Sequence, residues 1–400
     1  MHIVTSTDIL LPRTEDMGAW SVIACDQFTS EPDYWAAAEE RAAEKPSTLS
    51  LMLPEAWLHT ARAEGADGRI AGTMRRYLAE DVFQTVPDSF IYVERTLPDG
   101  RIRRGLVAAL DLEQYDFTGT QRTSVRSTEG TVEERLPPRV NIRRGAPLEM
   151  PHTLLLMDDR TDSVLSLAEK AKDALEKVYD FDLMLGGGHI AGWRVSGETK
   201  AAVQSALDAL DNAALQREKY GDAAENGKLT FAVGDGNHSL AAAKRFWEEK
   251  RETLPENERE TDPARFALVE IENIHEPSLD FEPIHRVIFD TDTSAFAAEF
   301  TAHRTEWEAE DKTLGERVAA AESFCRAYIA AHGGYIDYIH GDDTARSHGE
   351  KPNCAAVLLP PVEKSGLFLS VLKNGALPKK SFSMGNARDK RYYLECRKIR

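Results

Sequence analysis

The stretch LTFAVGDGNHSLAAAKRFW, residues Leu229–Trp247, decides how the rest of the chain is interpreted. It begins with apolar residues that favour a strand and ends with an alanine-rich run that favours a helix. Six permissive or reactive residues lie between the two runs: Gly234, Asp235, Gly236, Asn237, His238 and Ser239. The sequence therefore predicts a strand, a glycine-rich turn and a helix in direct succession.

A helix start of this kind suits an anion. Its first N–H groups are unpaired and carry the positive end of the helix dipole, which favours a phosphate or a carboxylate. Gly234 and Gly236 allow close backbone approach, and Asn237 or Ser239 would cap a helix starting at Leu240. Neither the acid nor the imidazole is needed for the turn, so together they could supply a general base or a metal ligand. The alternative is that the acid is a turn residue and the imidazole a satisfied polar side chain.

Strands and helices alternate irregularly along the chain. A hairpin is expected where Pro98-Asp99-Gly100 separates the apolar runs 90–93 and 104–110. Further predicted strands are 153–157, 190–195, 229–233, 266–272, 284–289, 335–339, 355–359 and 367–372. Predicted helices include 163–179, 198–218, 239–252, 293–300 and 313–331. Adjacent strands among these elements indicate an α+β or mixed α/β fold, with mixed sheets and flanking helices, rather than a doubly wound sheet.

The expected division is an N-terminal α+β part, residues 1–120, with its hairpin near 90–110. A larger mixed α/β body, residues 121–400, carries the glycine-rich loops, and one continuous domain remains the alternative. Residues 121–152 are polar, rich in arginine and interrupted by prolines, which is typical of a long loop or several short pieces.

Composition narrows the function classes. The 400 residues carry a net charge of -18, which argues against non-specific nucleic-acid binding. No apolar run approaches the roughly 20 residues of a membrane helix, and the N-terminus lacks a signal-peptide pattern, so a cytoplasmic protein is expected. The four cysteines are scattered, are expected to be reduced thiols, and include Cys25 as the one of interest. No metal ligands are predicted, because neither HxH nor HExxH spacing occurs.

Two other segments suit an anionic ligand. The run Leu185–Ile190 places Gly188 and His189 in either a close backbone approach or a plain flexible turn. Near the C-terminus, Lys380 and Ser381 lie in a basic segment, and lysines with hydroxyls suit phosphate oxygens. His285 and Arg286 form a third, smaller group of the same kind. Solvated charged surface is the alternative for the basic segment.

Several blocks along the chain resemble the domain of unknown function 1015 family nearly from end to end. They are Ile9–Pro12, Ile23–Ser30, Ser127–Thr131, Leu148–His152, Gly187–Ile190, Gly234–His238, Phe281–Arg286 and Lys380–Gly385. The wider family has Asp-Gly-His-His-Arg where this chain has Asp235–Ser239. That block resembles the signature of the ParB and sulfiredoxin-like group, which includes free serine kinases, so the resemblance implies a subdomain of that type.

In that group the loop at a helix N-terminus holds nucleotide phosphates and an acid assists the acceptor. The resemblance therefore implies phosphate contacts at the Gly234–His238 loop, Glu129 as the acid, and a nucleotide with Mg²⁺ as cofactors. Ser239 stands where the group has an arginine, so Arg286 or Lys380 would have to supply that charge.

Three functions follow. The first is a kinase-like enzyme that transfers a phosphoryl group from a nucleotide to a small hydroxyl-bearing metabolite, with Asp235, His238 and Glu129 as catalytic residues. The second is a nucleotide-binding regulatory or interaction module without turnover. The third is a metal-dependent hydrolase that uses His189, His238 and His285. We expect a small-molecule ligand and no membrane partner, the net charge argues against a nucleic-acid partner, and the sequence leaves a homo-oligomer open.

Overall fold

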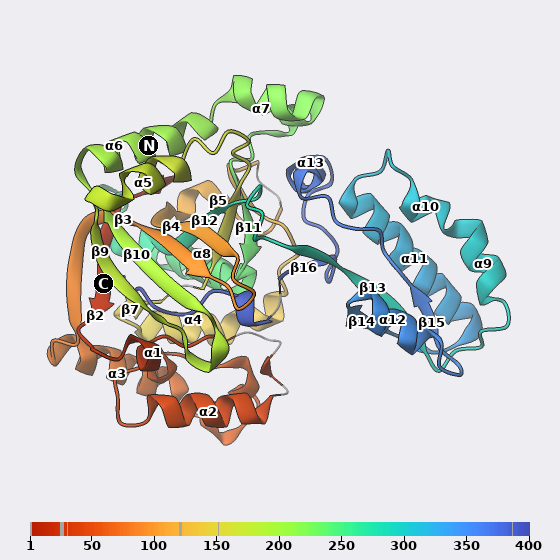
Figure 1. Ribbon diagram of the computed structural model, residues 1–400, viewed down its shortest axis with the longest axis horizontal. Coiled ribbons are helices and arrows are strands. Elements are labelled where there is room, and N and C mark those ends of the chain that lie inside the picture. Colours follow the sequence, from red (N-terminus) through yellow and green to blue (C-terminus); the bar gives the residue numbers. More distant parts are fainter. Residues whose placement is uncertain (1, 25–27, 30, 120–121, 151, 386) are drawn as a thin grey trace.

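A computed structural model of the protein describes residues 2–24, 28–29, 31–119, 122–150, 152–385 and 387–400, so Cys25 lies outside the described residues. The chain forms a main lobe and a small lobe, the latter comprising residues 284–359 (Figure 1). The fold is mixed α/β, as the sequence predicts, with one large mixed sheet and helices around it.

Within the described residues, the main lobe contains a sheet of 11 strands. In spatial order its main path is β5 (Tyr115–Asp116), β6 (Val125–Ser127), β11 (Phe231–Asp235), β8 (Leu154–Met157), β12 (Phe266–Asn273), β4 (Ile102–Asp111), β3 (Phe83–Thr96), β10 (His189–Val195) and β9 (Glu176–Asp182). β1 (Val4–Thr5) pairs with β4, and β2 (Thr7–Pro12) pairs with β3. The pairs β5–β6, β6–β11 and β8–β12 are parallel, and the other pairs are antiparallel. Strands from both sides of residue 120 therefore share one sheet.

The expected hairpin is confirmed. β3 and β4 pair antiparallel from Ile91↔Val107 to Thr96↔Ile102, and the Leu97 N–H donates to the Arg101 carbonyl across the turn. Both faces of β3 are buried, because Phe90 and Tyr92 enter one hydrophobic core while Ile91 and Val93 enter another. A strand covered on both faces reads as a continuous apolar run, which is what the sequence shows here.

Helices cover both faces of the sheet (Figure 1). One core packs α4 (Leu136–Gly145), α5 (Leu165–Ala171), α6 (Gly197–Leu210) and α8 (Asn237–Thr253) against the strands. The opposite core is built largely from α1 (Met17–Trp20), α2 (Pro32–Ala42) and α3 (Ala66–Ala79). A third apolar cluster joins α13 (Leu367–Asn374) to β8 and to Tyr220 at the end of α7 (Ala213–Tyr220). No helix among the described residues is long and apolar enough to cross a membrane.

Two element predictions are wrong. The predicted helix 163–179 ends early, because α5 stops at Ala171 and residues from Glu176 form the edge strand β9, which pairs with β10. The predicted strand 367–372 is the helix α13, in which Leu367, Phe368, Val371 and Leu372 lie on one buried face. Short apolar runs do not distinguish a strand from a helix, and in both segments the tertiary contacts determined which of the two forms.

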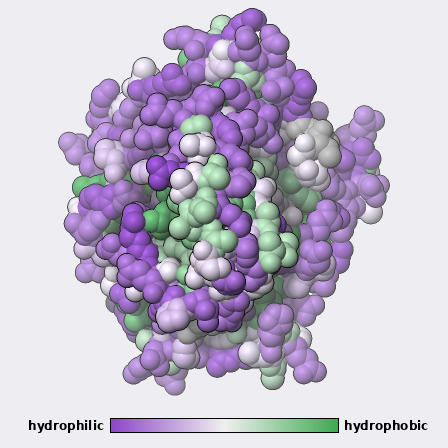
Figure 2. Space-filling view, turned by 90° about the vertical axis from the view of Figure 1, so that its right-hand side faces the viewer, coloured by the Kyte–Doolittle hydropathy of each residue, from purple (hydrophilic) through white to green (hydrophobic). Residues whose placement is uncertain are grey.

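The small lobe has its own core around Trp307, Phe324 and Tyr328. Its elements are α9 (Phe296–His303), α10 (Thr305–Glu308), α11 (Leu314–His332), β14 (Tyr335–His340), α12 (Asp342–Gly349) and β15 (Ala355–Val357). β13 (Phe281–Phe289) joins the lobes, because its first residues pair with β16 (Phe382–Met384) and its later residues pair with β14 and β15. The outer face of this lobe is mostly hydrophilic, with a band of weakly hydrophobic residues in its middle (Figure 2).

Candidate functional site

A cavity of about 570 Å³ opens where β11 passes into α8. Its wall also includes the segment after β6, part of α4, and β7 (Leu148–Glu149), which pairs with β17 (Arg397–Lys398). Residues of the C-terminal segment, between Leu377 and Met384 and between Lys390 and Tyr393, form another side, and Ile284, Tyr338 and His340 contribute from the β13–β14 region. Segments far apart in the sequence therefore meet around one hollow.

The start of α8 faces this cavity and requires glycine. Gly236 has φ +79°, and a Cβ atom there would lie 2.8 Å from Thr153 Oγ1 and 2.9 Å from Thr153 Cα. The helix begins at Asn237 with Gly236 as its N-cap, and no side chain caps it. The expected cap by Asn237 or Ser239 at Leu240 is therefore wrong. No side chain caps the first turn, in which the Ser239 N–H donates to the Gly236 carbonyl, so the N-terminal end of α8 presents the positive end of its helix dipole to the cavity.

Two further observations concern this loop. A Cβ atom on Gly234 would lie 2.6 Å from Met384 Sδ, so the glycine lets the C-terminal segment pack against β11. Asn237 Oδ1 is buried and has no hydrogen-bond partner among the described residues. Gly234, Gly236, Asn237 and Ser239 all line the cavity.

Asp235 lies at the end of β11 and forms an ion pair with Lys390, with 3.0 Å between Oδ2 and Nζ. Its other oxygen accepts the N–H of Gly236. Burial raises the pKa of Asp235, but Lys390 and the nearby His152 lower it more, so the pKa lies below its ordinary value. The carboxylate is thus ionised at neutral pH.

His238 projects from the first turn of α8, and its Nε2 accepts the backbone N–H of Val132 at 3.2 Å. That bond places the proton of the neutral ring on Nδ1. Because one ring nitrogen holds the 130–132 backbone, His238 has a structural role within the cavity wall.

Glu129 organises the opposite wall. Its carboxylate accepts the backbone N–H of Lys380, and the Leu377 N–H donates to the Thr128 carbonyl. Ser381 is buried and donates its hydroxyl proton to the Pro378 carbonyl. These bonds hold a loop whose Lys379 and Lys380 side chains are exposed at the cavity and have no carboxylate partner among the described residues.

Four predicted site residues do not line the cavity. Gly188 has φ +81°, and a Cβ atom there would lie 2.0 Å from the Thr96 carbonyl oxygen, so the close backbone approach at Gly188 is to the chain's own strand β3. His189 lies at the start of β10, beside the edge strand β9, and contacts Asp180 and Asp182, each at 2.7 Å.

The other two residues are buried in the β13 region. His285 contacts Asp342 and accepts the Leu359 N–H. Arg286 pairs with Glu322 and donates to the carbonyls of Ile284 and Lys380. Arg286 thus supports the backbone of the lysine loop, and its charge is matched by a carboxylate.

Sequence reasoning missed two residues of the cavity. Lys390 reaches Asp235 from the C-terminal segment, and His152 lies between β7 and β8 with its ring against Tyr393. Burial, together with Arg139, Lys390 and Arg391, lowers the pKa of His152 to about 4, and Asp235 opposes them. His152 belongs to the Leu148–His152 block, which was the available signal, but it has no recognisable spacing to Asp235.

The cavity is cationic although the whole chain carries a net charge of -18. Among the described residues, seven lysine and arginine side chains line it: Arg135, Arg139, Arg143, Lys379, Lys380, Lys390 and Arg391. Four acids of the described lining oppose them: Glu55, Glu129, Glu149 and Asp235. Because Arg391 pairs with Glu270 and Glu395 behind the lining, the excess of positive charge lies at Lys379 and Lys380, and it favours an anionic ligand. Among the described residues no group of three or more His, Cys, Asp or Glu side chains is placed to hold a metal ion.

Comparison with known proteins identifies the family. The chain belongs to the family described as Protein of unknown function (DUF1015), whose sequence profile matches residues 7–398. No curated protein sequence matches the chain.

Three solved structures share a distant likeness. A conserved hypothetical protein from Pyrococcus furiosus has 9% identity and a TM-score of 0.32, with 73% of this chain and 95% of that chain covered. A free serine kinase in complex with AMP has 9% identity and a TM-score of 0.35, covering 72% and 90%. A mutant form of a free serine kinase, also in complex with AMP, has 8% identity and a TM-score of 0.35, covering 72% and 91%. At these TM-scores the likeness does not identify a ligand for this chain.

Proposed function

We propose that the chain binds a nucleotide or another phosphorylated small molecule in this cavity, with the phosphate groups at the N-terminus of α8. The observation that carries the proposal is the uncapped helix start at Gly236, which faces a cavity with an excess of positive charge. Helix N-termini bind phosphate through their free N–H groups and the helix dipole, and lysines add point charges. Lys379 and Lys380 supply the charge that Ser239 cannot.

We further propose that the bound ligand donates a phosphoryl group to a small hydroxyl-bearing metabolite. Such a reaction requires positioned phosphates, positive charge and an acid or base near the acceptor. Asp235 is an ionised carboxylate held by Lys390 within the same cavity. Glu129 uses one carboxylate oxygen to accept the Lys380 N–H, and its other oxygen would be a ligand for Mg²⁺. Bound Mg²⁺ would neutralise charge that develops on the transferred group.

The structure bears differently on the two alternatives, the binding module and the metal-dependent hydrolase. A nucleotide-binding module without turnover uses the same contacts and differs only in the absence of transfer. The metal-dependent hydrolase needs His189, His238 and His285 around one ion, but the three lie on β10, α8 and β13 and only His238 lines the cavity. That hydrolase is not proposed further.

The first test measures binding. Thermal unfolding with a panel of nucleotides, pyrophosphate and phosphorylated metabolites, each with Mg²⁺, should reveal a ligand that stabilises the protein. At about 100 times its Kd such a ligand adds about 2.7 kcal/mol. Lys380→Ala should weaken binding about tenfold, or about 1.4 kcal/mol, and Asp235→Ala should also reduce the shift.

Lys373→Ala is the matched control, because Lys373 is an exposed lysine at the end of α13 that does not line the cavity. It should leave the shift unchanged. No stabilisation by any phosphorylated compound would contradict both proposals. Once a ligand is known, incubation with a panel of hydroxyl-bearing metabolites, followed by detection of the phosphorylated product, separates the enzyme from the binding module.

A further inference from the structure

Among the described residues, His152, His238 and His340 line the cavity, and the rings of His152 and His238 are not equivalent. His238 uses Nε2 to accept the Val132 N–H, and the ring is part of the wall. His152 packs one face of its ring against Tyr393, with centroids 4.9 Å apart and planes inclined by 42°. Among the described residues, neither ring nitrogen of His152 has a hydrogen-bond partner. His152 is therefore an anchored imidazole with nitrogens available to a ligand.

The charges around His152 come from three different elements. Asp235 at the end of β11 favours the protonated ring, whereas Arg139 of α4 and Lys390 and Arg391 of the C-terminal segment disfavour it. Together with burial, the cations keep the ring neutral at pH 7. A neutral imidazole beside an ionised carboxylate and a lysine has the arrangement expected of a proton acceptor.

We propose that His152, rather than His238, is the catalytic base that takes the proton of the acceptor hydroxyl. The proposal rests on the function proposed above, with a nucleoside diphosphate or triphosphate as the phosphoanhydride donor. The hydroxyl oxygen forms a bond to phosphorus, and its proton moves to an open nitrogen of His152. The bond from phosphorus to the bridging oxygen breaks, and its electron pair stays on the leaving phosphate.

Binding of the donor prepares His152 for this step. Phosphate groups at the α8 N-terminus add negative charge beside Lys390, Arg139 and Arg391, the same cations that disfavour the protonated ring. Since a nearby anion stabilises an imidazolium, donor binding raises the pKa of His152. The protein should therefore take up a proton on binding, in a pH range between the two pKa values of the ring. This proton uptake can be measured without any turnover.

The experiment is titration calorimetry of the full-length chain with pyrophosphate and with ATP, each with Mg²⁺, at pH 5.5 in buffers of different ionisation enthalpy. The slope of the observed binding enthalpy against the ionisation enthalpy of the buffer gives the number of protons exchanged on binding. Because the phosphates themselves can release protons, the relevant quantity is the difference between variants. His152→Asn should still bind but should lose a substantial fraction of one proton relative to the wild type, whereas His238→Asn should keep the wild-type value.

A second variant, His152→Gln, guards against misfolding of the first, and unfolding curves of both confirm a folded protein. Equal proton exchange in the wild type and the His152 variants overturns the proposal, as does loss of the uptake in His238→Asn alone. If neither probe binds the wild type, the proposed function itself fails and this inference fails with it. Once an acceptor is known, His152→Asn should lower kcat about 100-fold with little change in donor affinity.

Discussion

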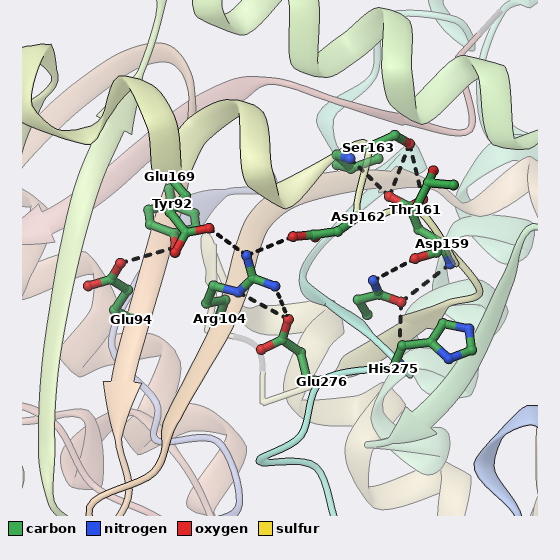
Figure 3. A network of polar contacts seen from close by, with 12 residues as sticks. Tyr92, Glu94, Arg104, Asp159, Thr161, Asp162, Ser163, Glu169, His275 and Glu276 are labelled. Atoms are coloured by element: carbon green, nitrogen blue, oxygen red, sulfur yellow. Dashed lines mark hydrogen bonds and ion pairs between the residues drawn. The ribbon is translucent and has the colours of Figure 1, made fainter.

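Two charged regions, the Arg104 cluster and the cavity, differ in how far their positive side chains are matched by carboxylates. In the Arg104 cluster, one guanidinium on β4 meets three carboxylates, from Asp162, Glu169 and Glu276 (Figure 3). In the cavity, five of the lining cations pair with carboxylates, but Lys379 and Lys380 have no carboxylate partner among the described residues. Charges that satisfy one another tie elements together, whereas an excess of one sign around a hollow is suited to a ligand.

The Arg104 cluster shows what a structural network looks like. It joins β4 to the turn after β8, to α5 and to the turn after β12 (Figure 3). The neighbouring Asp159 accepts the Ser163 hydroxyl and the Val164 N–H, and Asn273 donates to the Asp159 carbonyl. The cluster consists mainly of acids, and its contacts show that these acids connect neighbouring strands, turns and a helix to one another through Arg104.

The largest expected effect comes from breaking this cluster. Arg104→Gln would leave three carboxylates without their cation, and Glu276 is only 4% exposed. Since Asp162 and Glu169 are more exposed, we expect a loss of about 2 to 3 kcal/mol in the free energy of unfolding, measured by urea denaturation. Arg76→Gln, which removes an exposed pair with Glu80, should change it by less than about 0.5 kcal/mol.

Ligand binding should be unaffected by Arg104→Gln, so the ligand-induced rise in melting temperature stays at the wild-type value. A weakened rise would show that the two regions are coupled and would break the comparison.

The next effect concerns the backbone of the cavity. Gly236→Ala places a methyl group against Thr153 at a backbone conformation that L residues rarely adopt. We therefore expect the free energy of unfolding to fall by about 2 to 3 kcal/mol and ligand binding to weaken. Gly100→Ala is the matched control, because Gly100 has φ +86° but no atom within 4 Å of the added Cβ. It should lose only about 1 kcal/mol. Equal losses in urea denaturation would mean that Thr153 does not restrict the site.

Sequence could predict the parts of this site that are local. The Gly234–Ser239 loop is recognisable by its glycines between a strand and a helix, and Lys380 with Ser381 lies in a visibly basic segment. The mixed α/β class follows equally from the irregular alternation of elements. These predictions depend on neighbours in the chain, where turn chemistry and helix propensity apply.

The missed parts depend on contacts that are remote in the sequence. Lys390 reaches Asp235 across 155 residues, and the ring of His152 contacts that of Tyr393, 241 residues further along the chain. Conversely, His285 and Arg286 suit a ligand by residue type, but β13 buries them and pairs them with Asp342 and Glu322. Residue type alone does not distinguish a side chain that is available to a ligand from one that is already paired within the protein, because the tertiary fold determines which partner each side chain contacts.

The smallest effect separates the two regions by pH. The folded-state pKa of His152, about 4, lies below its ordinary 6.5, so the unfolded chain takes up a proton there first and stability falls as pH drops from 6.5 towards 4. Beside the Arg104 cluster, burial raises the pKa of Asp158, but hydrogen bonds from His275 and Tyr220 lower it further, so its contribution is lost only below its ordinary 3.8.

At pH 5 the contribution of His152 to the free energy of unfolding should therefore be reduced, while the contribution of Asp158 persists. Urea denaturation of the wild type at pH 7 and pH 5 should show a loss in the free energy of unfolding, to which the half-buried His152 contributes roughly 1 to 2 kcal/mol. His152→Asn should remove that share, and His59→Asn, at an exposed position, should not. Saturating pyrophosphate should shrink the wild-type loss, because the bound anion stabilises the imidazolium. An identical loss in the wild type and in His152→Asn would show that the cavity does not hold this ring neutral.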